Sequence, residues 1–511
     1  MGSCGTGNLT LNPVHPPFVL PGEPGNPILE YPEGFELTNS SEAASASAAK
    51  HSRTAAAKPT STTKTSSYLR TTPTLGVRNV NWPPYTINNF HGDLAVHAVS
   101  PNATHHGGYL QYDFHNLFGH QILNATYQAL LKIKPGKRPF IIGRSTFPGS
   151  GKWAGHWGGD NESRWALMYF SIPQALSFSI FGIPMFGVDT CGFGGNADAE
   201  LCSRWMQLSA FFPFYRNHNI LGARSQEPYV WSSVAEASRR AMRIRYMLLP
   251  YLYTLMMQAS LDGSTVMRAL AWEFPNEPWL ADADRQFMLG SAVMVTPCLE
   301  QGATTVKGVF PGVRDGKTVW YDWYTGRKAS EGVRPGENIT IDAPLGHIPV
   351  FLRGGSVVPV QEPGMTTTES RSKPWGLIVA LDWHEFAEGV LYLDDGESLM
   401  PQEVTWVKVS YIPILTPLVF SVRFLLDGQQ FSASTGSLIV QPAGTYVDIN
   451  PLANVTVLGV KNKPHKMWLD GQDVEPGYWR YREEKETLEL RGLEALFMEG
   501  AWKKTWELRW E

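Results

Sequence analysis

The chain has 511 residues and a formal net charge of −4, and 18% of its residues are charged. Because single hydrophobic cores seldom exceed ~250–300 residues, this length predicts several domains. The small negative charge argues against a nucleic-acid partner, which would select a basic surface. The charged fraction lies below the roughly 25% of average soluble domains. Aromatic residues reach 12%, a weak compositional sign of a loop-rich, secreted, carbohydrate-active protein.

The N-terminal part changes composition three times. Residues 1–37 are rich in proline and aromatic residues and predict an ordered, irregular loop over a larger fold. Residues 38–67 contain mainly Ala, Ser, Thr and Lys. Such a segment buries too little apolar surface to offset its ordering entropy, so we expect a flexible insertion within the first domain. Loop-like sequence follows to about residue 120, and residues 117–133 have helical spacing that predicts a helix on the outside of the domain.

Two apolar runs that resemble strands lead into polar side chains, and a further polar cluster follows them. The run 139–142 leads to Arg144, the run 182–188 ends at Asp189, and the cluster 215–219 contains His218. This rhythm is typical of a (β/α) barrel, in which functional groups lie where strands pass into loops.

The glycine-rich loop 149–161 carries the most informative carboxyl group, Asp160. Glycines let a backbone approach a ligand closely. The rings of Trp153 and Trp157 offer flat apolar faces on which the C–H face of a sugar can stack. Rings around Asp160 would disfavour its charged form, which suits a general acid. The alternative is an ordinary Gly-Asp-Asn turn with both tryptophans in the core, and the companion residues Arg144, Asp189 and His218 argue against it.

Taken in order, five motifs resemble glycoside hydrolase family 31, and within it the secreted fungal α-glucosidases and the group called α/β-glucosidases. These motifs are Arg144-Ser-Thr-Phe147, His156-Trp-Gly-Gly-Asp160-Asn161, Gly182-Ile-Pro184, Asp189-Thr-Cys-Gly-Phe193 and Arg216-Asn-His218-Asn219. The resemblance covers nearly the whole chain and is weakest near residues 400–445. It implies a hydrolase that releases glucose from the non-reducing ends of α-glucosides, with β-glucosides as further substrates in the subgroup.

The resemblance also implies roles for individual residues. Asp160 would be the acid/base carboxylate, and Arg144 and His218 would bind sugar hydroxyls. The sugar subsite would be lined by Trp157, Asp189 and Phe193. Two carboxylates suffice for this chemistry, so neither metal nor organic cofactor is expected.

Retention of configuration requires a second carboxyl roughly 5–5.5 Å from the first. The family places this nucleophile in a Trp-Ile-Asp-Met-Asn-Glu-like motif, which is not found in this sequence. We therefore expect an N-terminally truncated chain that starts after the nucleophile. The alternative hypothesis is a catalytically inactive fragment that at most binds carbohydrate.

The four cysteines do not have zinc-ligand spacing. The resemblance implies a disulfide between Cys191 and Cys202. Cys4 would then need a partner outside the chain, and Cys298 is expected to be a buried thiol.

Beyond His218, we expect a helix from a capping Ser232 to about Ser260, kinked or divided at Pro250. It would close the barrel part, residues 1–264. Short strand-like runs then predict a proximal β-sandwich over 265–363 and a distal β-domain over 364–511. The run 394–397 is acidic but lacks the spacing of a calcium loop and predicts a hairpin turn.

The uncharged run 409–422 has fourteen residues. A transmembrane helix needs ~20 residues, so no membrane span is expected. Buried β-strands are the ordinary interpretation, and a translated intron is the alternative.

Seven Asn-X-Ser/Thr sequons favour the secretory route, although the first residues show no signal peptide. Asn161 is expected to stay unmodified because a glycan there would block Asp160. The glycosylation candidates are Asn8, Asn39, Asn102, Asn124, Asn338 and Asn454.

Overall fold

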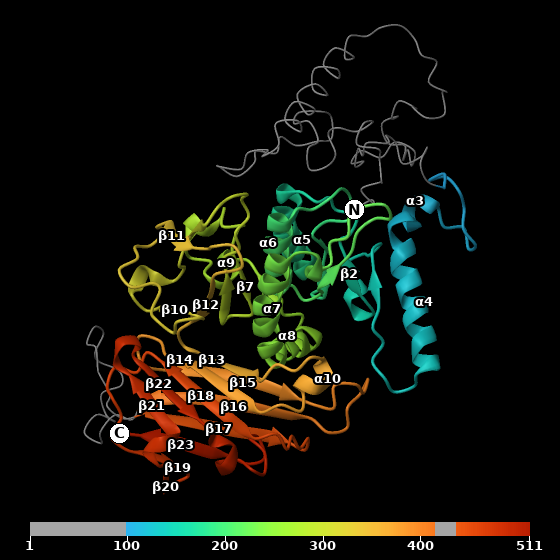
Figure 1. Cartoon of the computed structure of the whole chain (residues 1–511). Coiled ribbons are helices and arrows are strands. Elements are labelled where there is room, and N and C mark those ends of the chain that lie inside the picture. Colours follow the sequence, from blue (N-terminus) through green and yellow to red (C-terminus); the bar gives the residue numbers. More distant parts are fainter. Residues whose placement is uncertain (1–98, 414–435) are drawn as a thin grey trace.

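The computed structural model describes residues 99–413 and 436–511 (Figure 1). The expected insertion at 38–67, the sequons at Asn8 and Asn39, and residues 414–422 of the uncharged run lie outside the described residues. The first part of that run, up to Pro413, belongs to a β-strand.

Short parallel strands and helices make up the first part of the described chain. β1, β2 and β3 form one parallel sheet, and β4 pairs with β5 in parallel. Parallel neighbours need crossover connections. Helix α5 connects β2 to β3 and α6 connects β4 to β5, whereas β1 and β2 are joined by a loop that contains a short 3-10 helix. The elements are α3 (Gln111–Phe114), α4 (Phe118–Ile133), β1 (Ile142–Gly143), β2 (Gly155–Trp157), α5 (Trp165–Ile180), β3 (Phe186–Gly187), β4 (Asp189–Thr190), α6 (Ala199–Ser209) and β5 (Arg216–Asn217). This is the strand-to-helix order expected for barrel sequence.

The long helix predicted after His218 is two helices, α7 (Ser232–Met247) and α8 (Leu249–Asp262). Pro250 lies in the first turn of α8, where its missing N–H is tolerated, so the predicted division is confirmed. The predicted cap at Ser232 is wrong. Ser232 is already helical, and the extended residue before the helix is Trp231, whose side chain makes no capping hydrogen bond.

A five-stranded antiparallel sheet of order β10-β12-β8-β7-β6 follows, beside a two-stranded sheet of β9 and β11. Four of its strands coincide with apolar runs that suggested strands in the sequence. The elements are β6 (Met267–Arg268), α9 (Leu270–Glu273), β7 (Phe287–Leu289), β8 (Val293–Val295), β9 (Thr305–Gly308), β10 (Trp320–Asp322), β11 (Ile339–Asp342) and β12 (Val350–Arg353).

The last part of the chain is one curled sheet of order β20-β19-β23-β17-β16-β15-β13-β14-β18-β22-β21 (Figure 1). Its first strand, β13, lies before residue 364, so the sheet does not coincide with the segment 364–511 expected from sequence. The elements are β13 (Ser356–Gln361), α10 (Thr367–Ser370), β14 (Trp375–Ala380), β15 (Ala387–Leu393), β16 (Thr405–Pro413), β17 (Gly436–Gly444), β18 (Leu452–Leu458), β19 (Met467–Leu469), β20 (Gln472–Asp473), β21 (Trp479–Arg482), β22 (Thr487–Arg491) and β23 (Trp506–Trp510).

Short 3-10 helices occur in the connections. They are η1 (His115–Leu117), η2 (Ser150–Lys152), η3 (Pro228–Val230), η4 (Pro278–Leu280), η5 (Val313–Asp315), η7 (Pro476–Tyr478), η8 (Glu483–Lys485) and η9 (Leu493–Leu496). No helix within residues 99–413 and 436–511 is long and apolar enough to span a membrane.

One hydrophobic core joins the three parts. Trp205 of α6, Val293 of β8 and Val358 of β13 belong to the same buried cluster. In Figure 1, α8 lies between the other helices and the large sheet. A second core lies within the curled sheet, around residues such as Leu490 and Trp506. Because the first core crosses all three parts, the large sheet supports the helices directly.

Of the sequon residues within the described ranges, three candidates are exposed and Asn124 of α4 is partly buried. The exposed residues are Asn102, Asn338 and Asn454. Their glycosylation stays a prediction.

A buried carboxylate ties the segment before β1 to the large sheet. Asp394 follows β15, and its side chain is fully buried. It forms an ion pair with Arg138, and it accepts hydrogen bonds from Tyr253 of α8 at 2.7 Å and from Tyr392 of β15 at 3.0 Å. The backbone N–H of Arg138 also donates to Glu397 O at 2.9 Å. The acidic run 394–397 therefore joins two parts of the molecule, in addition to forming a turn.

Burial by itself raises the pKa of Asp394, but the donors Tyr253, Arg138 and the Gly396 N–H outweigh it and hold the pKa below its ordinary value. A lowered folded-state pKa stabilises the fold above the unfolded-state pKa, and this contribution is lost as the pH falls through the folded value.

Replacing Asp394 with Asn should therefore destabilise the protein in a pH-dependent way. At about pH 7 the variant should unfold at lower urea than the wild type. The gap should narrow as the pH falls below the ordinary Asp pKa of about 4 and through the lowered folded-state pKa, below which the wild-type carboxyl is also neutral. Tryptophan fluorescence during urea unfolding measures both midpoints. Glu397→Gln is the matched control, because the Glu397 side chain is 69% exposed in its pair with Lys137. A gap that is the same at every pH would contradict the assignment.

Candidate active site

The predicted site residues lie where the parallel strands end. Arg144 directly follows β1, Asp160 follows β2, Asp189 lies just after β3 at the first residue of β4, and His218 directly follows β5. Carboxyl ends of parallel strands lie on one side of a sheet, so these side chains face a common region.

Asp160 and Arg144 form an ion pair, with 2.9 Å between Asp160 Oδ2 and Arg144 Nη1. Their side chains are 14% and 28% exposed, so the pair is partly accessible. The Arg144 guanidinium also lies 5.3 Å from the ring centroid of Trp157, within the range of a cation–π contact. Three of the residues predicted from sequence are therefore together.

Asp189 is hydrogen-bonded to Trp157 and Asp160. Its side chain is fully buried. Its Oδ1 accepts the Trp157 indole N–H at 2.8 Å, and its Oδ2 accepts the Asp160 backbone N–H at 3.2 Å. A fully buried carboxylate cannot present a surface to a ligand, so the expectation that Asp189 lines the site differs from the structure. Its contacts instead orient Trp157 and Asp160.

The charge on Asp189 is compensated by several donors. Burial raises the pKa of its carboxyl, and the Trp157 N–H, the Asp160 N–H and the Arg216 guanidinium act in the opposite direction. Arg216 Nη2 lies 3.3 Å from Asp189 Oδ1. A buried carboxylate of this kind needs such partners, because transfer out of water is costly.

Arg216 is a site residue that the sequence interpretation did not assign. Its guanidinium lies 4.3 Å from the Trp157 ring centroid as well as against Asp189. Trp157 is thus held by two cations and one carboxylate. The available signal was the motif Arg216-Asn-His218-Asn219, in which only the histidine received a role.

His218 adds an aromatic wall. Its ring centroid lies 5.2 Å from Phe193 and 6.1 Å from Trp157, with its ring edge-on to the indole. The Ile220 N–H donates to Phe193 O at 3.0 Å, which holds the two loops together. All three rings are partly exposed, so they form a wall beside the Arg144–Asp160 pair.

Two backbone features bring Asp160 to this position. A side chain at Gly159 would place its Cβ 2.0 Å from the Trp157 indole, so only glycine fits there. Asp160 has φ of 57°, which is uncommon for a residue other than glycine. Its N–H bond to Asp189 offsets the strain. Asn161 donates its side-chain amide to Asp189 O at 3.1 Å, and its sequon is still expected to be unused.

Trp153 does not join the group around Asp160, contrary to the expectation of two flanking tryptophans. Its ring packs at 4.6 Å from His120 of α4. The glycine-rich loop therefore presents Trp157 to the site and uses Trp153 to contact a helix.

His156 supports β2 from the core. Its ring stacks on Phe178 of α5 with 3.8 Å between centroids, and its Nδ1 is 2.8 Å from the Thr146 hydroxyl. Burial lowers its pKa to about 3, so it stays neutral at ordinary pH. It is a structural residue beneath the site.

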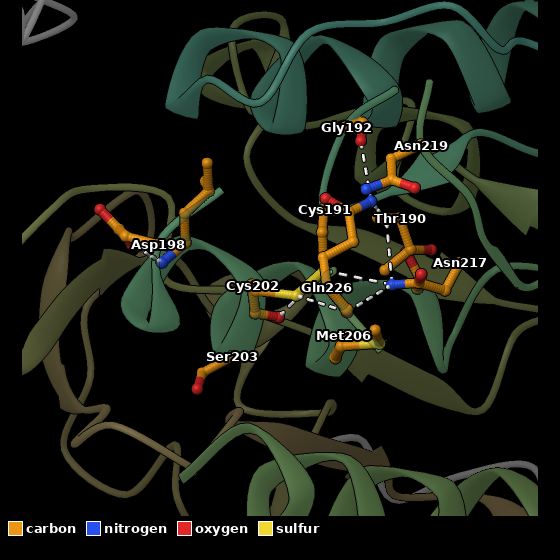
Figure 2. Close-up of a disulfide and its surroundings, with 12 residues drawn as sticks. Thr190, Cys191, Gly192, Asp198, Cys202, Ser203, Met206, Asn217, Asn219 and Gln226 are labelled. Atoms are coloured by element: carbon orange, nitrogen blue, oxygen red, sulfur yellow. Dashed lines mark hydrogen bonds between the residues drawn. A yellow bond between two sulfur atoms is a disulfide. The ribbon is translucent and has the colours of Figure 1, made fainter. Parts of the chain in front are cut away.

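Cys191 and Cys202 form a disulfide, as the family resemblance implied (Figure 2). It links the end of β4 to α6 behind Phe193. Cys298 is a buried free thiol. No group of three or more metal-ligating side chains occurs in the part of the chain that the structure describes.

A parallel β/α fold with a carboxylate–guanidinium pair and an aromatic wall at its strand ends has the organisation of (β/α)-barrel enzymes. Models of protein families agree with this class. The glycosyl hydrolases family 31 TIM-barrel domain matches residues 61–255, and the glycosyl hydrolase family 31 C-terminal domain matches residues 263–358. The chain belongs to glycoside hydrolase family 31.

Relatives in fungi share much of the sequence. The chain is 57% identical to an alpha-glucosidase of Aspergillus oryzae and 58% identical to one of Aspergillus niger. Each alignment covers 100% of this chain and 49% of the relative. The chain therefore spans about half the length of these relatives.

Solved structures of the family have the same fold. A Flavobacterium johnsoniae GH31 dextranase, complexed with glucose, aligns with a TM-score of 0.68 and 25% identity over 80% of this chain and 50% of that one. The catalytic subunit of an ER glucosidase II complex aligns with a TM-score of 0.65 and 28% identity over 83% of this chain and 45% of that one.

Replacing Gly159 with Ala should displace the Trp157 indole, because the new methyl group would overlap it. Overpacking of this kind typically costs about 1–3 kcal/mol. We expect a lower thermal midpoint and an altered near-ultraviolet circular dichroism signal. Gly477→Ala is the control, since a Cβ at Gly477 meets no atom within 4 Å. The same thermal midpoint and the same circular dichroism signal for the two variants would argue against the close contact at Gly159.

Proposed function

We propose that this chain carries the acid/base half of a retaining glycosidase that releases glucose from the non-reducing ends of α-glucosides. The observation that carries the proposal is the partly exposed Asp160–Arg144 pair beside the aromatic wall of Trp157, Phe193 and His218. Fungal relatives named alpha-glucosidase, which align over the whole chain, support the choice of substrate.

In this mechanism Asp160 protonates the glycosidic oxygen and then removes a proton from the water that releases the sugar. Arg144 holds the carboxyl group in place and is within reach of ligand hydroxyls at the same surface. The rings of Trp157 and Phe193 offer apolar faces to the C–H face of a glucosyl unit. Asp189 acts through Trp157 and Asp160, which it orients by hydrogen bonds.

A second candidate function is sugar binding without hydrolysis. A retaining mechanism needs a second carboxyl roughly 5–5.5 Å from the acid/base group. Asp189 contacts Asp160, but it is fully buried and both of its oxygens are hydrogen-bonded, so it is not free to attack a sugar. Glucose binding by the 511-residue chain without release of glucose from maltose would favour this candidate.

We also infer an extracellular site of action. The three exposed sequons at Asn102, Asn338 and Asn454 support it. Mass spectrometry of the protein from a fungal secretory host would detect glycans at these residues, and their absence would count against the inference.

Replacing Asp160 with Asn is the direct test of the acid/base role. In a protein that contains this chain together with the second carboxyl group of a retaining pair, release of glucose from maltose should fall about 100-fold or more, because general acid catalysis typically contributes 10²–10⁴-fold. An aryl glucoside with a nitrophenolate leaving group should be affected less in its first step, because that leaving group needs no proton. Glucose release and nitrophenolate release measure the two effects.

Glu162→Gln is the matched control for this test. Glu162 lies two residues from Asp160 and pairs with Arg164 at 2.6 Å. It should retain most of the activity. An Asp160→Asn variant that slows the first step equally for both substrates, or for neither, would exclude Asp160 as the general acid. Cellobiose, assayed beside maltose and isomaltose, tests the β-glucoside activity of the subgroup.

A further inference from the structure

Gln226 is a buried side chain that touches three parts of the site. It lies in the loop after β5 and is 2% exposed. Its Nε2 donates to the backbone carbonyls of Gly192 at 2.9 Å, His218 at 3.1 Å and Thr190 at 3.4 Å. Figure 2 shows Gln226 beside the disulfide, with Thr190 and Gly192 on one side.

Two of the three carbonyls belong to residues next to a site residue, and the third belongs to a site residue itself. Thr190 follows Asp189, Gly192 precedes Phe193, and the third carbonyl is that of His218 itself. One amide nitrogen thereby joins the loop that carries Phe193 to the loop that carries His218. These two side chains form the aromatic wall, with 5.2 Å between their ring centroids.

The Asn217 side chain, from the β5 side, also donates hydrogen bonds to the backbone of Gln226 and of Thr190. Its Nδ2 donates to Gln226 O at 3.1 Å and to Thr190 O at 3.4 Å. The disulfide fixes Cys191, between Thr190 and Gly192, to Cys202 of α6. The β4 loop is therefore anchored covalently to a buried helix, and Gln226 extends that anchor to the β5 loop.

The orientation of the Gln226 amide is determined by its surroundings. Its Oε1 is buried and has no hydrogen-bond partner among the described residues. Turning the amide around would place Oε1 against three carbonyl oxygens, which repel it. The side chain therefore acts as a donor to the backbone, and a residue of the same size without N–H groups would remove a donor from the carbonyls of Gly192 and His218.

We propose that Gln226 is a positioning residue that holds His218 and Phe193 at the spacing needed to bind a glucosyl unit. This proposal rests on the proposed function for its ligand, but the spacing itself is a property of the fold. Gln226 does not touch the sugar in this arrangement. Its effect reaches the ligand through the backbone of the two loops.

The test compares Gln226→Met with Gln207→Met in the full 511-residue chain. Gln207 is also a buried glutamine, 1% exposed, whose Oε1 likewise has no partner among the described residues. Its Nε2 donates to Ser203 O at 3.0 Å, within its own helix α6. Both variants lose a buried amide of the same size, but only Gln226 connects the two site loops.

Glucose affinity, measured by calorimetric titration, is the first readout. Both variants should have lower thermal midpoints than the wild type. Gln226→Met should weaken glucose binding about tenfold, because the loops that carry His218 and Phe193 lose the donor that holds their spacing. Gln207→Met should bind glucose as the wild type does. Equal affinities for the two variants would overturn the proposal.

The nuclear magnetic resonance signal of the His218 ring, assigned with a His218→Gln variant, is a second readout that needs no ligand. It should shift in Gln226→Met and not in Gln207→Met, and an unshifted signal would overturn the proposal. A wild-type chain that does not bind glucose, with the signal shifted as expected, would count against the proposed function alone.

Gln226→Asn covers the case in which Gln226→Met does not fold. Its shorter amide keeps its N–H groups but reaches the three carbonyls less well. An intermediate loss of affinity and a smaller shift of the His218 signal are expected. Wild-type behaviour on both readouts would overturn the proposal.

Discussion

The buried carboxylate of Asp189 is the interaction on which the candidate site depends. It is surrounded by protein and would be unstable there without donors. The indole of Trp157, the backbone of Asp160 and the guanidinium of Arg216 supply them. Each of these donors either belongs to the site or contacts a site residue. Because the buried carboxylate is stable only when they are in place, it fixes the positions of the site residues. The left-handed backbone at Asp160 is tolerated for the same reason: its N–H has a charged acceptor.

The parts outside the strands hold this arrangement in place. Gln226 and the Cys191–Cys202 disulfide join the loops that carry Phe193 and His218. On the far side, Asp394 of the large sheet binds Arg138, six residues before Arg144. A shared hydrophobic core then connects α6, the five-stranded sheet and β13. The large sheet thus contributes to the position of β1, although it lies away from Asp160.

Family membership and the proposed chemistry rest on different kinds of support. The first follows from sequence and fold similarity. The proposed chemistry follows from an arrangement of one accessible carboxylate, two guanidinium groups and three aromatic rings. The described part of the chain supplies the groups that the proposal uses for acid/base catalysis and for sugar stacking. Among the described residues, Asp189 contacts Asp160, but it is buried and hydrogen-bonded and does not fit the role of a nucleophile.

The sequence by itself indicated strands before Arg144 and Asp189 and helical sequence after His218, since apolar runs and their polar ends are local patterns. It assigned residues 149–161 to a loop, but β2 lies within them. It also indicated Arg144, Asp160, Trp157, Phe193 and His218, because ordered motifs preserve residue types at fixed spacing. Only the tertiary structure decided that Trp153 contacts α4, that Asp189 is buried beneath Trp157, and that Gln226 and Asp394 hold distant segments together. Arg138 and Asp394 are 256 residues apart in the chain. Periodicity shows which side of a helix or strand is apolar. Whether a polar side chain can be buried depends on hydrogen-bond partners from distant parts of the chain, and only folding brings these together.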